Sequence, residues 1–373
     1  MKLTPTQIPN LRPTKAEINL SAFRNNFKKA RAIIGNKCKL MLSIKADAYG
    51  HGAIELAKIS QKEKLLNGFA VALIEEGILL RNSGIKLPIL VLGSIYPFSS
   101  FETALKHDLS VTVASLRAAK ELSQAAKKLK VKAKCHVKID TGLGRIGPRK
   151  PKALKTLKFL SSNPFVKIEG IYTHFSSVDT DTSYTKFQLK QFRELANECE
   201  RQKIPTGFKH CDNSYAMVKY RQTHFDMVRP GAAVYGLIKG FEPILSLKSK
   251  IVFLKYAGKG ESISYGRTHK CKSLTRIATI PVGYGDGYSR NLSNEGYVLI
   301  GGQRCKILGA VTMDMMMVDV SGVKDVKIGQ EAVLIGRQGK KEITAQDLAR
   351  LTKTNFYEIT TAILPRVPRV YIK

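Results

Sequence analysis

The stretch "LSIKADAYGHG", residues 42–52, ends an apolar run with a lysine and continues with small residues, a tyrosine and two glycines. The residues before it, within "CKLMLSIK", are apolar enough for a buried strand, and the glycines favour a loop after it. We therefore expect Lys45 at the end of a strand, at one edge of a sheet. An amine in that position is a candidate reactive group of an active site.

Further short apolar runs follow over the first two-thirds of the chain, and amphipathic stretches separate them. A predicted helix, "NLSAFRNNFKKARAII", precedes the first run. The eight runs are "CKLMLSIKA", "GFAVAL", "PILVLGSI", "SVTVAS", "KCHVKID", "IEGIYTHFS", "FKHCDNS" and "FDMVRPGAAVYG". Eight parallel strands with intervening helices predict a (β/α)8 barrel over residues 1–244, with an active site at the C-terminal ends of the strands.

The pattern changes at about residue 245, where closely spaced β runs are separated by Gly, Asp and Asn turns. We predict a separate, mainly β domain over residues 245–373, which the extreme N-terminus is a candidate to join. Near the end, "ITAQDLARLTKTNFYEITTAIL" opens with a T-x-x-D capping box at Thr344 and Asp347 and predicts a helix.

Composition limits the class of protein. A chain of 373 residues with 43% apolar content has room for two domains with sizeable cores. It has no apolar leader-like segment and no apolar stretch long enough to span a bilayer, so we expect a soluble, cytoplasmic protein. The six cysteines are dispersed without a CxxC pair, which is typical of reduced, buried thiols, and we expect no structural metal.

The net charge of +33 is unusual and results from 62 Lys and Arg residues against only 29 Asp and Glu residues in the sequence. Such a charge attracts nucleic acid or other anionic polymers. However, the basic residues are spread over the whole chain, and no recognisable nucleic-acid-binding pattern accompanies them. We expect neither nucleic acid nor a membrane as a partner, and a basic protein that binds anionic polymers is the alternative of a different class.

A set of motifs along the chain resembles the bacterial alanine racemases, enzymes that use pyridoxal 5′-phosphate. In order, the motifs are "IKADAYGHG", "VKIDTGLGRIG", "YTHFSS", "DNSYA", "MVRPGAAVYG", "SYGRTH", "PVGYGDGYSR", "VTMDM" and "YEITTAILPRVPR". They run from the first predicted strand to the C-terminus. The resemblance implies a homodimer that interconverts L-alanine and D-alanine and supplies D-alanine for the peptidoglycan of the bacterial cell wall.

The resemblance implies two proton carriers, because racemisation removes a proton from one face of Cα and returns it to the other. Lys45 is the residue that would bind the cofactor covalently and then act as a base, which requires a lowered amine pKa. Tyr265, from the β domain of the partner subunit, would act on the opposite face. A free tyrosine has a pKa of about 10, and His174 is the implied hydrogen-bonded neighbour that would help Tyr265 to work near neutrality.

The cofactor phosphate can be placed from the fold as well as from the resemblance. Phosphates in barrels often lie beside the loops after strands seven and eight. Ser214 follows the seventh predicted strand, and Gly231 with Ala232 follows the eighth. The resemblance adds Tyr49 and Tyr357 as phosphate contacts.

The resemblance also assigns cations around the cofactor ring. Arg229 would face the pyridine nitrogen, and a permanent donor there makes the ring a weaker electron sink, which disfavours side reactions such as transamination. Arg145 would contact the phenolic oxygen of the cofactor and the substrate carboxylate. Lys138 matches a lysine that is often carbamylated in the family and would then hold Arg145.

Substrate size would be limited by Met313 of the partner subunit and its neighbour Asp314, while Tyr284, Arg290 and Tyr357 would narrow the entrance. The chain departs from the family pattern at Met315, where glutamine is usual, and at Thr361, where cysteine is frequent. These differences leave substrate breadth open. A serine or broad-specificity racemase, or a barrel-type decarboxylase, is therefore the alternative on the same scaffold.

Overall fold

The computed structural model describes residues 11–373, which form two compact units. The barrel unit comprises residues 26–48 and 52–234. The β unit comprises residues 11–25, 49–51 and 235–373. The units thus divide after Val234, upstream of the boundary at residue 244 that we expected, and residues 1–10 lie outside the described part.

The barrel unit contains one parallel sheet of eight strands in the order β8-β7-β6-β5-β4-β3-β2-β9. Each predicted apolar run overlaps one of them, so the predicted barrel is confirmed. Most residues of these strands are buried, as in parallel sheets that helices cover. Their bounds are β2 Lys39–Ser43, β3 Gly68–Val71, β4 Ile89–Val91, β5 Ser110–Val113, β6 Ala133–Lys138, β7 Val166–Tyr172, β8 Phe208–His210 and β9 Met227–Val228.

The barrel is nearly closed between β8 and β9, the two strands at the ends of this order. Strands β8 and β9 share no ladder, but Asp226 N donates to Lys209 O at 3.1 Å, and Arg229 N donates to Asp212 O at 3.1 Å. The residues that leave the C-terminal ends of these two strands are therefore brought together.

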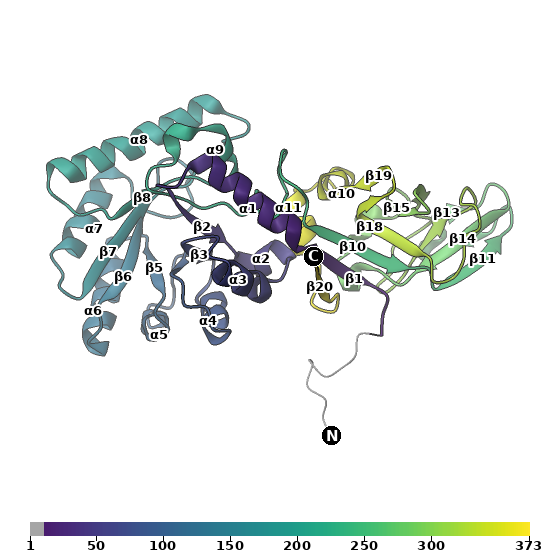
Figure 1. Cartoon of the computed structure of the whole chain (residues 1–373), viewed down its shortest axis with the longest axis horizontal. Helices are drawn as coiled ribbons and strands as arrows, with labels where there is room; N and C mark the ends of the chain where they lie inside the picture. The colour runs from purple at the N-terminus through teal and green to yellow at the C-terminus, as the bar shows by residue number, and fades with distance from the viewer. Residues whose placement is uncertain (1–10) are drawn as a thin grey trace, which may run out of the picture. The chain divides into compact units, whose positions relative to one another are not determined.

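Helices cover the outside of the barrel strands, which is clearest for α5 to α8 in Figure 1. They are amphipathic, and α6, for example, buries Ala119 and Leu122 and begins at Ser115, whose side chain accepts from Ala118 N. The bounds are α3 Ala53–Lys62, α4 Ile74–Asn82, α5 Ser100–Lys106, α6 Leu116–Leu129, α7 Lys150–Ser161, α8 Thr182–Arg201, α9 Ser214–Lys219 and the 3-10 turn η2 Arg221–Thr223.

The predicted first helix is confirmed as α1, Leu20–Ile34. It begins after Asn19, whose side chain accepts from Ala22 N at 2.9 Å. Phe23, Phe27 and Ile34 of this helix are buried, and Leu20 at its start is partly buried.

The β unit is built mainly from strands, as predicted. One sheet has the order β16-β15-β18-β10-β1-β20, with β19 paired to β18, and a second has the order β11-β14-β17. Strand β1, from the N-terminal part of the chain, pairs with β10 and β20 and so belongs to this unit. The bounds are β1 Lys15–Asn19, β10 Leu245–Lys250, β11 Phe253–Ala257, β12 Ser262–Ile263, β13 His269–Lys270, β14 Thr275–Ile280, β15 Tyr297–Ile300, β16 Gln303–Lys306, β17 Met316–Asp319, β18 Glu331–Gln338, β19 Lys341–Ile343 and β20 Arg369–Ile372.

The C-terminal helical segment differs from the prediction, because it forms two helices. The capping box is present: Thr344 N donates to Asp347 Oδ2 at 2.9 Å, and Asp347 N donates to Thr344 Oγ1 at 3.0 Å. The first helix, α10 Ala345–Thr352, ends at Lys353, which adopts a left-handed φ of 56°. Asn355 then caps α11, Phe356–Thr361, by accepting from Glu358 N. This local cap restarts the helix in a new direction.

Two expectations from composition can be compared with the structure. All six cysteines are buried free thiols, as predicted. Among residues 11–373, no helix has both the length and the apolar composition that crossing a bilayer requires.

Candidate active site

Lys45 begins a turn, α2 (Lys45–Gly50), whose backbone is left-handed. The φ angles of the four residues from Ala46 to Tyr49 lie between 49° and 56°. For L-amino acids this conformation costs about 1–2 kcal/mol per residue. Strained backbone of this kind persists only where the surroundings enforce it, and it is concentrated at functional sites.

Side chains from neighbouring loops hold this turn in place. Glu76, at the start of α4, accepts from Ala46 N at 2.6 Å and, through its other oxygen, from Ala72 N at 2.7 Å. Asp47 accepts from Ala53 N at 2.7 Å. Glu76 thus ties the loops after β2 and β3 together and fixes the backbone that carries Lys45. Sequence reasoning missed Glu76, because nothing in its local sequence marks it.

The surroundings of Lys45 favour a neutral amine. Its pKa is lowered, first by burial and then by the positive charge of Arg145, and Glu76 opposes the shift only in part. A lysine with a lowered pKa is a better nucleophile and base at neutral pH.

Arg229 is buried, and it is one end of a chain of hydrogen bonds that continues through His210 to His136. Its Nη1 donates to His210 Nδ1 at 2.5 Å, and its Nη2 donates to Thr173 O at 2.9 Å. Because arginine only donates, His210 carries its proton on Nε2 and donates it to His136 Nδ1 at 2.8 Å. Burial, followed by the charge of Arg229, lowers the pKa of His136 to about 3, so these imidazoles stay neutral and leave Arg229 as the cation.

Neither His136 nor His210 was identified from the sequence. A signal existed, because His136 and Lys138 are two residues apart on β6 and share one face of the strand. Tyr172 was also missed, although its ring lies between the two cations. The ring centroid is 5.2 Å from the Arg229 guanidinium carbon and 5.3 Å from Lys138 Nζ.

Lys138 lies at the end of β6 and is fully buried, with 1% of its surface exposed. Its Nζ donates to Ile139 O at 2.9 Å. Burial, followed by the charge of Arg229, lowers the pKa of this amine to about 7, and Asp140 only partly offsets the effect. Much of the amine is therefore unprotonated at neutral pH.

Arg145 and His174 lie in the loops after β6 and β7. Arg145 is exposed, and the backbone of its loop is held by Asp140, which accepts from Gly142 N at 3.1 Å and Gly144 N at 3.0 Å. His174 is half-buried, and its pKa is well below the ordinary value, because of burial first and then the charges of Arg229, Lys138, Arg145 and Lys45. His174 is thus neutral at pH 7.

The predicted phosphate residues of the barrel unit lie together. Ser214 Oγ accepts from the backbone N–H of Gly231 and of Ala233, both at 3.0 Å, and Ser214 and Ala232 are buried. The loops after β8 and β9 are joined at this point. Because its oxygen accepts these two N–H groups, the Ser214 hydroxyl can donate its own hydrogen, which suits a phosphate.

The two tyrosines expected at the phosphate belong to the β unit and lie side by side. The ring centroids of Tyr49 and Tyr357 are 5.7 Å apart, and Tyr49 also contacts Tyr235 at 5.3 Å. Gly50, which follows Tyr49, has no side chain where a Cβ would meet Thr360 O of α11 at 2.0 Å. The backbone of α2 therefore approaches α11 closely, and glycine is required there.

Tyr265 projects from the β unit with 74% of its surface exposed. It opens the 3-10 turn η3 (Tyr265–Arg267), and the residue before it, Ser264, has φ 67° and ψ −178°. This region is essentially reserved for glycine, so the turn is strained. Ser264 Oγ donates to Ala310 O at 2.6 Å, which helps to hold the strained conformation. The local structure presents the phenol to the exterior.

The residues expected at the substrate entrance occupy adjoining loops of the β unit. Tyr284 begins the 3-10 turn η4 (Tyr284–Asp286), and its N donates to Thr312 O at 3.0 Å, next to Met313. Arg290 begins η5 (Arg290–Leu292), and this turn meets the same loop, because Val311 N donates to Ser293 Oγ at 3.0 Å. The side chains of Met313 and Tyr284 are exposed. Tyr265, Tyr284, Arg290, Met313 and Asp314 therefore belong to the β unit, whereas Lys45 and Arg229 belong to the barrel unit.

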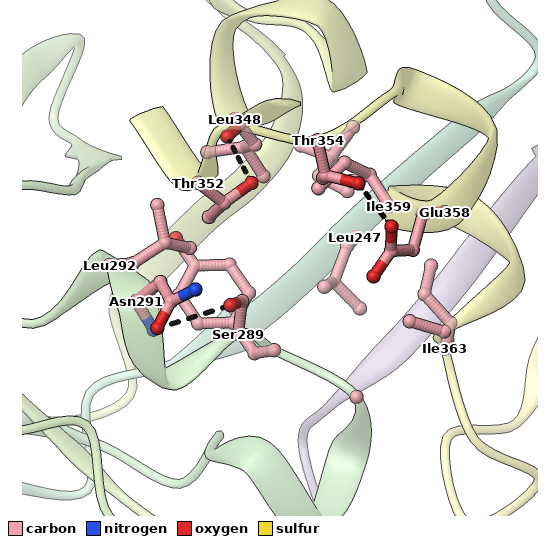
Figure 2. A pocket seen from close by; sticks show the side chains of 14 residues that line it. Leu247, Ser289, Asn291, Leu292, Leu348, Thr352, Thr354, Glu358, Ile359 and Ile363 are labelled. Carbon is pink, nitrogen blue, oxygen red and sulfur yellow. Dashed lines mark hydrogen bonds between the residues drawn. The ribbon is translucent and has the colours of Figure 1, made fainter. Parts of the chain in front are cut away.

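Figure 2 shows a cavity in the β unit that contains none of the predicted site residues. It has a volume of about 80 Å³ and lies between β10, the turn around Ser289, and helices α10 and α11. The polar groups drawn there bond to one another, as Asn291 N does to Ser289 Oγ and Thr354 does to the Glu358 carboxylate. This cavity is distinct from the predicted site.

Comparisons with known proteins agree over the whole chain. Residues 18–239 match the family model "Alanine racemase, N-terminal domain", and residues 244–371 match "Alanine racemase, C-terminal domain". A protein named alanine racemase from Halothermothrix orenii is 43% identical over 369 residues, which cover 96% of this chain and 97% of that protein.

Solved structures are equally similar. The alanine racemase of Clostridium difficile 630 superposes with a TM-score of 0.92 and 36% identity, covering 97% of this chain and 96% of that one. The alanine racemase of Bacillus anthracis, solved with bound L-Ala-P, gives a TM-score of 0.92 and 36% identity, covering 98% of this chain and 96% of that one. The protein described here belongs to the alanine racemase family.

Proposed function

We propose that this protein interconverts L-alanine and D-alanine with pyridoxal 5′-phosphate as cofactor, and that it acts as a homodimer with active sites shared between subunits. The observation that carries the proposal is that the barrel unit contains both Lys45 and Arg229. The first is an amine with a lowered pKa at the mouth of the barrel, and the second is a buried permanent donor in the same unit. In a bacterial cell the product D-alanine would supply peptidoglycan synthesis in the cytoplasm.

The residues present fit the cofactor chemically. Lys45 offers an amine to an aldehyde, and the Ser214 hydroxyl, whose oxygen accepts from Gly231 N, can donate its hydrogen to a phosphate. Arg229 is held by neutral His210 and the backbone carbonyls of Thr173 and Cys211, and within residues 11–373 no carboxylate forms an ion pair with it. Tyr49 and Tyr357 would add hydroxyl donors to the phosphate end, and Ala232 would line it.

Two of the residues would move the proton, and two others would assist them. When bound, pyridoxal 5′-phosphate withdraws electrons from the substrate Cα and makes its proton acidic. Lys45 Nζ removes or returns the proton at one face of Cα, and the Tyr265 hydroxyl of the partner subunit does so at the other. His174, neutral in this structure, can share a hydrogen bond with that phenol. Arg145 orients the substrate carboxylate by charge-assisted hydrogen bonds.

The homodimer is supported by the separation of the predicted residues into two units. Tyr265 and Met313 are exposed on adjoining loops of the β unit, as expected of groups that complete a site on another subunit. Full-length similarity to proteins named alanine racemase favours alanine over serine and over a decarboxylase. It also disfavours the reading as a binding protein for anionic polymers.

A chiral assay tests the function directly. Purified protein is incubated with L-alanine or with L-serine, with and without added pyridoxal 5′-phosphate, and both enantiomers are measured. We expect D-alanine to form in a cofactor-dependent manner, with serine converted more slowly. Absence of D-alanine from a folded, cofactor-loaded protein would refute the proposal, and faster conversion of serine would favour the broad-specificity alternative.

We further propose that Lys138 is carbamylated and that the resulting anion holds Arg145. With a pKa of about 7, about half of the Lys138 amine is unprotonated at pH 7, compared with roughly one in 2,500 for a lysine of pKa about 10.4. The neutral nitrogen attacks the carbon of CO2 and loses one proton, which leaves a carbamate. The modification also replaces a cation that repels Arg145 by an anion that attracts it.

Carbon NMR in 13C-bicarbonate tests this modification. We expect one carbamate signal that grows as the pH rises through about 7, because the unprotonated amine becomes more abundant. The signal should disappear in Lys138→Gln, which keeps a polar side chain without the amine. A spectrum of the wild-type protein without a carbamate signal, at pH 8 and excess bicarbonate, would rule the modification out.

A further inference from the structure

Asp286 is a buried carboxylate at the centre of a charged cluster in the β unit. Only 1% of its side chain is exposed, and it accepts two hydrogen bonds from Arg12, at 2.8 and 3.0 Å. Arg366 Nε donates to it at 2.6 Å, and Gly283 N donates at 3.0 Å. Burial tends to raise the pKa of Asp286, but these donors outweigh it and the pKa is lowered. Asp286 is thus ionised and paired with two cations.

Arg366 bridges from this cluster to the loop that carries Met313. Its Nη2 donates to Asp314 Oδ1 at 2.7 Å while its Nε stays on Asp286. Asp314 differs from Asp286 in being 57% exposed, and within residues 11–373 its one ion pair is with Arg366. One planar guanidinium therefore serves two carboxylates at once, through donors held in a fixed geometry.

The backbone beneath this bridge is already well ordered. Gly285 N donates to Met313 O at 2.8 Å, and Tyr284 N donates to Thr312 O at 3.0 Å. The two loops are so close that a Cβ on Gly283 would meet Thr312 O at 2.1 Å. Because these contacts and the Arg12 pair remain without Arg366, the cluster does not need Arg366 in order to fold. The specific contribution of Arg366 is to Asp314.

We propose that Arg366 is a positioning residue for the reaction, which fixes the Met313 loop through Asp314 and cancels the Asp314 charge where the substrate carboxylate enters. This inference rests on the proposed function, in which Met313 borders the substrate. Without Arg366, the Asp314 carboxylate is uncompensated and free to move beside the entering alanine carboxylate. Like charges then weaken substrate binding, and added salt screens the effect.

Steady-state kinetics of the holoenzyme test this role in Arg366→Gln, Arg366→Lys and the double variant Arg366→Gln/Asp314→Asn. For Arg366→Gln we expect the KM for alanine to rise about tenfold at low ionic strength, equivalent to about 1.4 kcal/mol, with kcat nearly unchanged. The increase should shrink as salt is added. Arg366→Lys, which keeps the charge but lacks the planar fork of donors, should lie between wild type and Arg366→Gln.

The double variant separates charge from structure. Removing the Asp314 charge together with Arg366 should bring KM back towards the wild-type value, whereas a purely structural loss would remain. Arg337→Gln is the matched control, because it removes another exposed arginine–carboxylate pair of the β unit, with Glu342, and should leave KM unchanged. If Arg366→Gln fails to fold, Arg366→Lys still tests the proposal, because its KM should exceed the wild-type value at low ionic strength.

Two results would overturn the proposal. One is an unchanged KM in a folded, dimeric, cofactor-loaded Arg366→Gln enzyme. The other is a double variant with the same KM and the same salt response as Arg366→Gln. Failure of the proposed function would look different, because the wild-type enzyme in the same assay would then not racemise alanine at all.

Discussion

Lys45→Ala is expected to purify as a folded protein that neither shows the visible absorbance of bound pyridoxal 5′-phosphate nor racemises alanine. The substitution removes both the proposed covalent attachment point and one of the two proposed proton carriers. Loss of a general base alone lowers rates by about 10² to 10⁴, so we expect the combined loss to exceed about 10³. Absorbance spectra and chiral chromatography on the same preparation measure both effects.

Lys39→Ala is the matched control for Lys45→Ala. Lys39 lies at the other end of strand β2, where its exposed amine is over the Phe208 ring at 4.2 Å. We expect that variant to keep cofactor absorbance and activity. A Lys45→Ala protein that retained the absorbance after dialysis and turned over at the wild-type rate would exclude Lys45 as the cofactor lysine.

Tyr265→Phe should keep the cofactor and lose turnover, with kcat lower by about 10² to 10⁴. Phenylalanine preserves the ring and removes only the hydroxyl, and because Tyr265 is largely exposed we expect stability to change by less than about 0.5 kcal/mol. Lys45 can still act at its own face, so exchange of the Cα proton with D2O should persist for one enantiomer and be lost for the other. Proton NMR of each enantiomer incubated separately measures this exchange.

Tyr256→Phe controls for the loss of an exposed tyrosine hydroxyl in the same unit, on strand β11. It should racemise alanine normally. Equal exchange of both enantiomers by Tyr265→Phe, at wild-type rates, would contradict the assignment of Tyr265 as the second proton carrier.

The strands of the barrel and the position of Lys45 could be predicted, because both depend on local sequence. An apolar run such as residues 40–44 predicts a buried strand from local sequence alone. The residue that follows the run must then lie at the C-terminal end of that strand. The left-handed turn from Ala46 to Tyr49 could not be predicted in this way. Only Asp47 among these residues is of a type that tolerates a positive φ well, and the turn is held by Glu76, thirty residues away.

The network behind Arg229 was missed for a related reason. His136 and His210 lie on different strands, and only the barrel brings their rings into hydrogen-bond contact. The prediction of a single C-terminal helix was wrong for a different reason. The helical periodicity continues through Lys353, although α10 ends before it and Asn355 caps a second helix. The resemblance identified residues that would touch cofactor or substrate, whereas the residues that position them depend on tertiary contacts.

Subunit mixing is the most direct test of the central claim, that each active site combines Lys45 of one subunit with Tyr265 of the other. Lys45→Ala and Tyr265→Phe are each nearly inactive as homodimers, but a mixed dimer would contain one site with both native residues. After equal mixing and subunit exchange, half of the dimers are mixed and each has one intact site, so we predict about a quarter of wild-type activity. Mixed dimers that form, as verified by differently tagged subunits, but remain inactive would contradict the shared-site account.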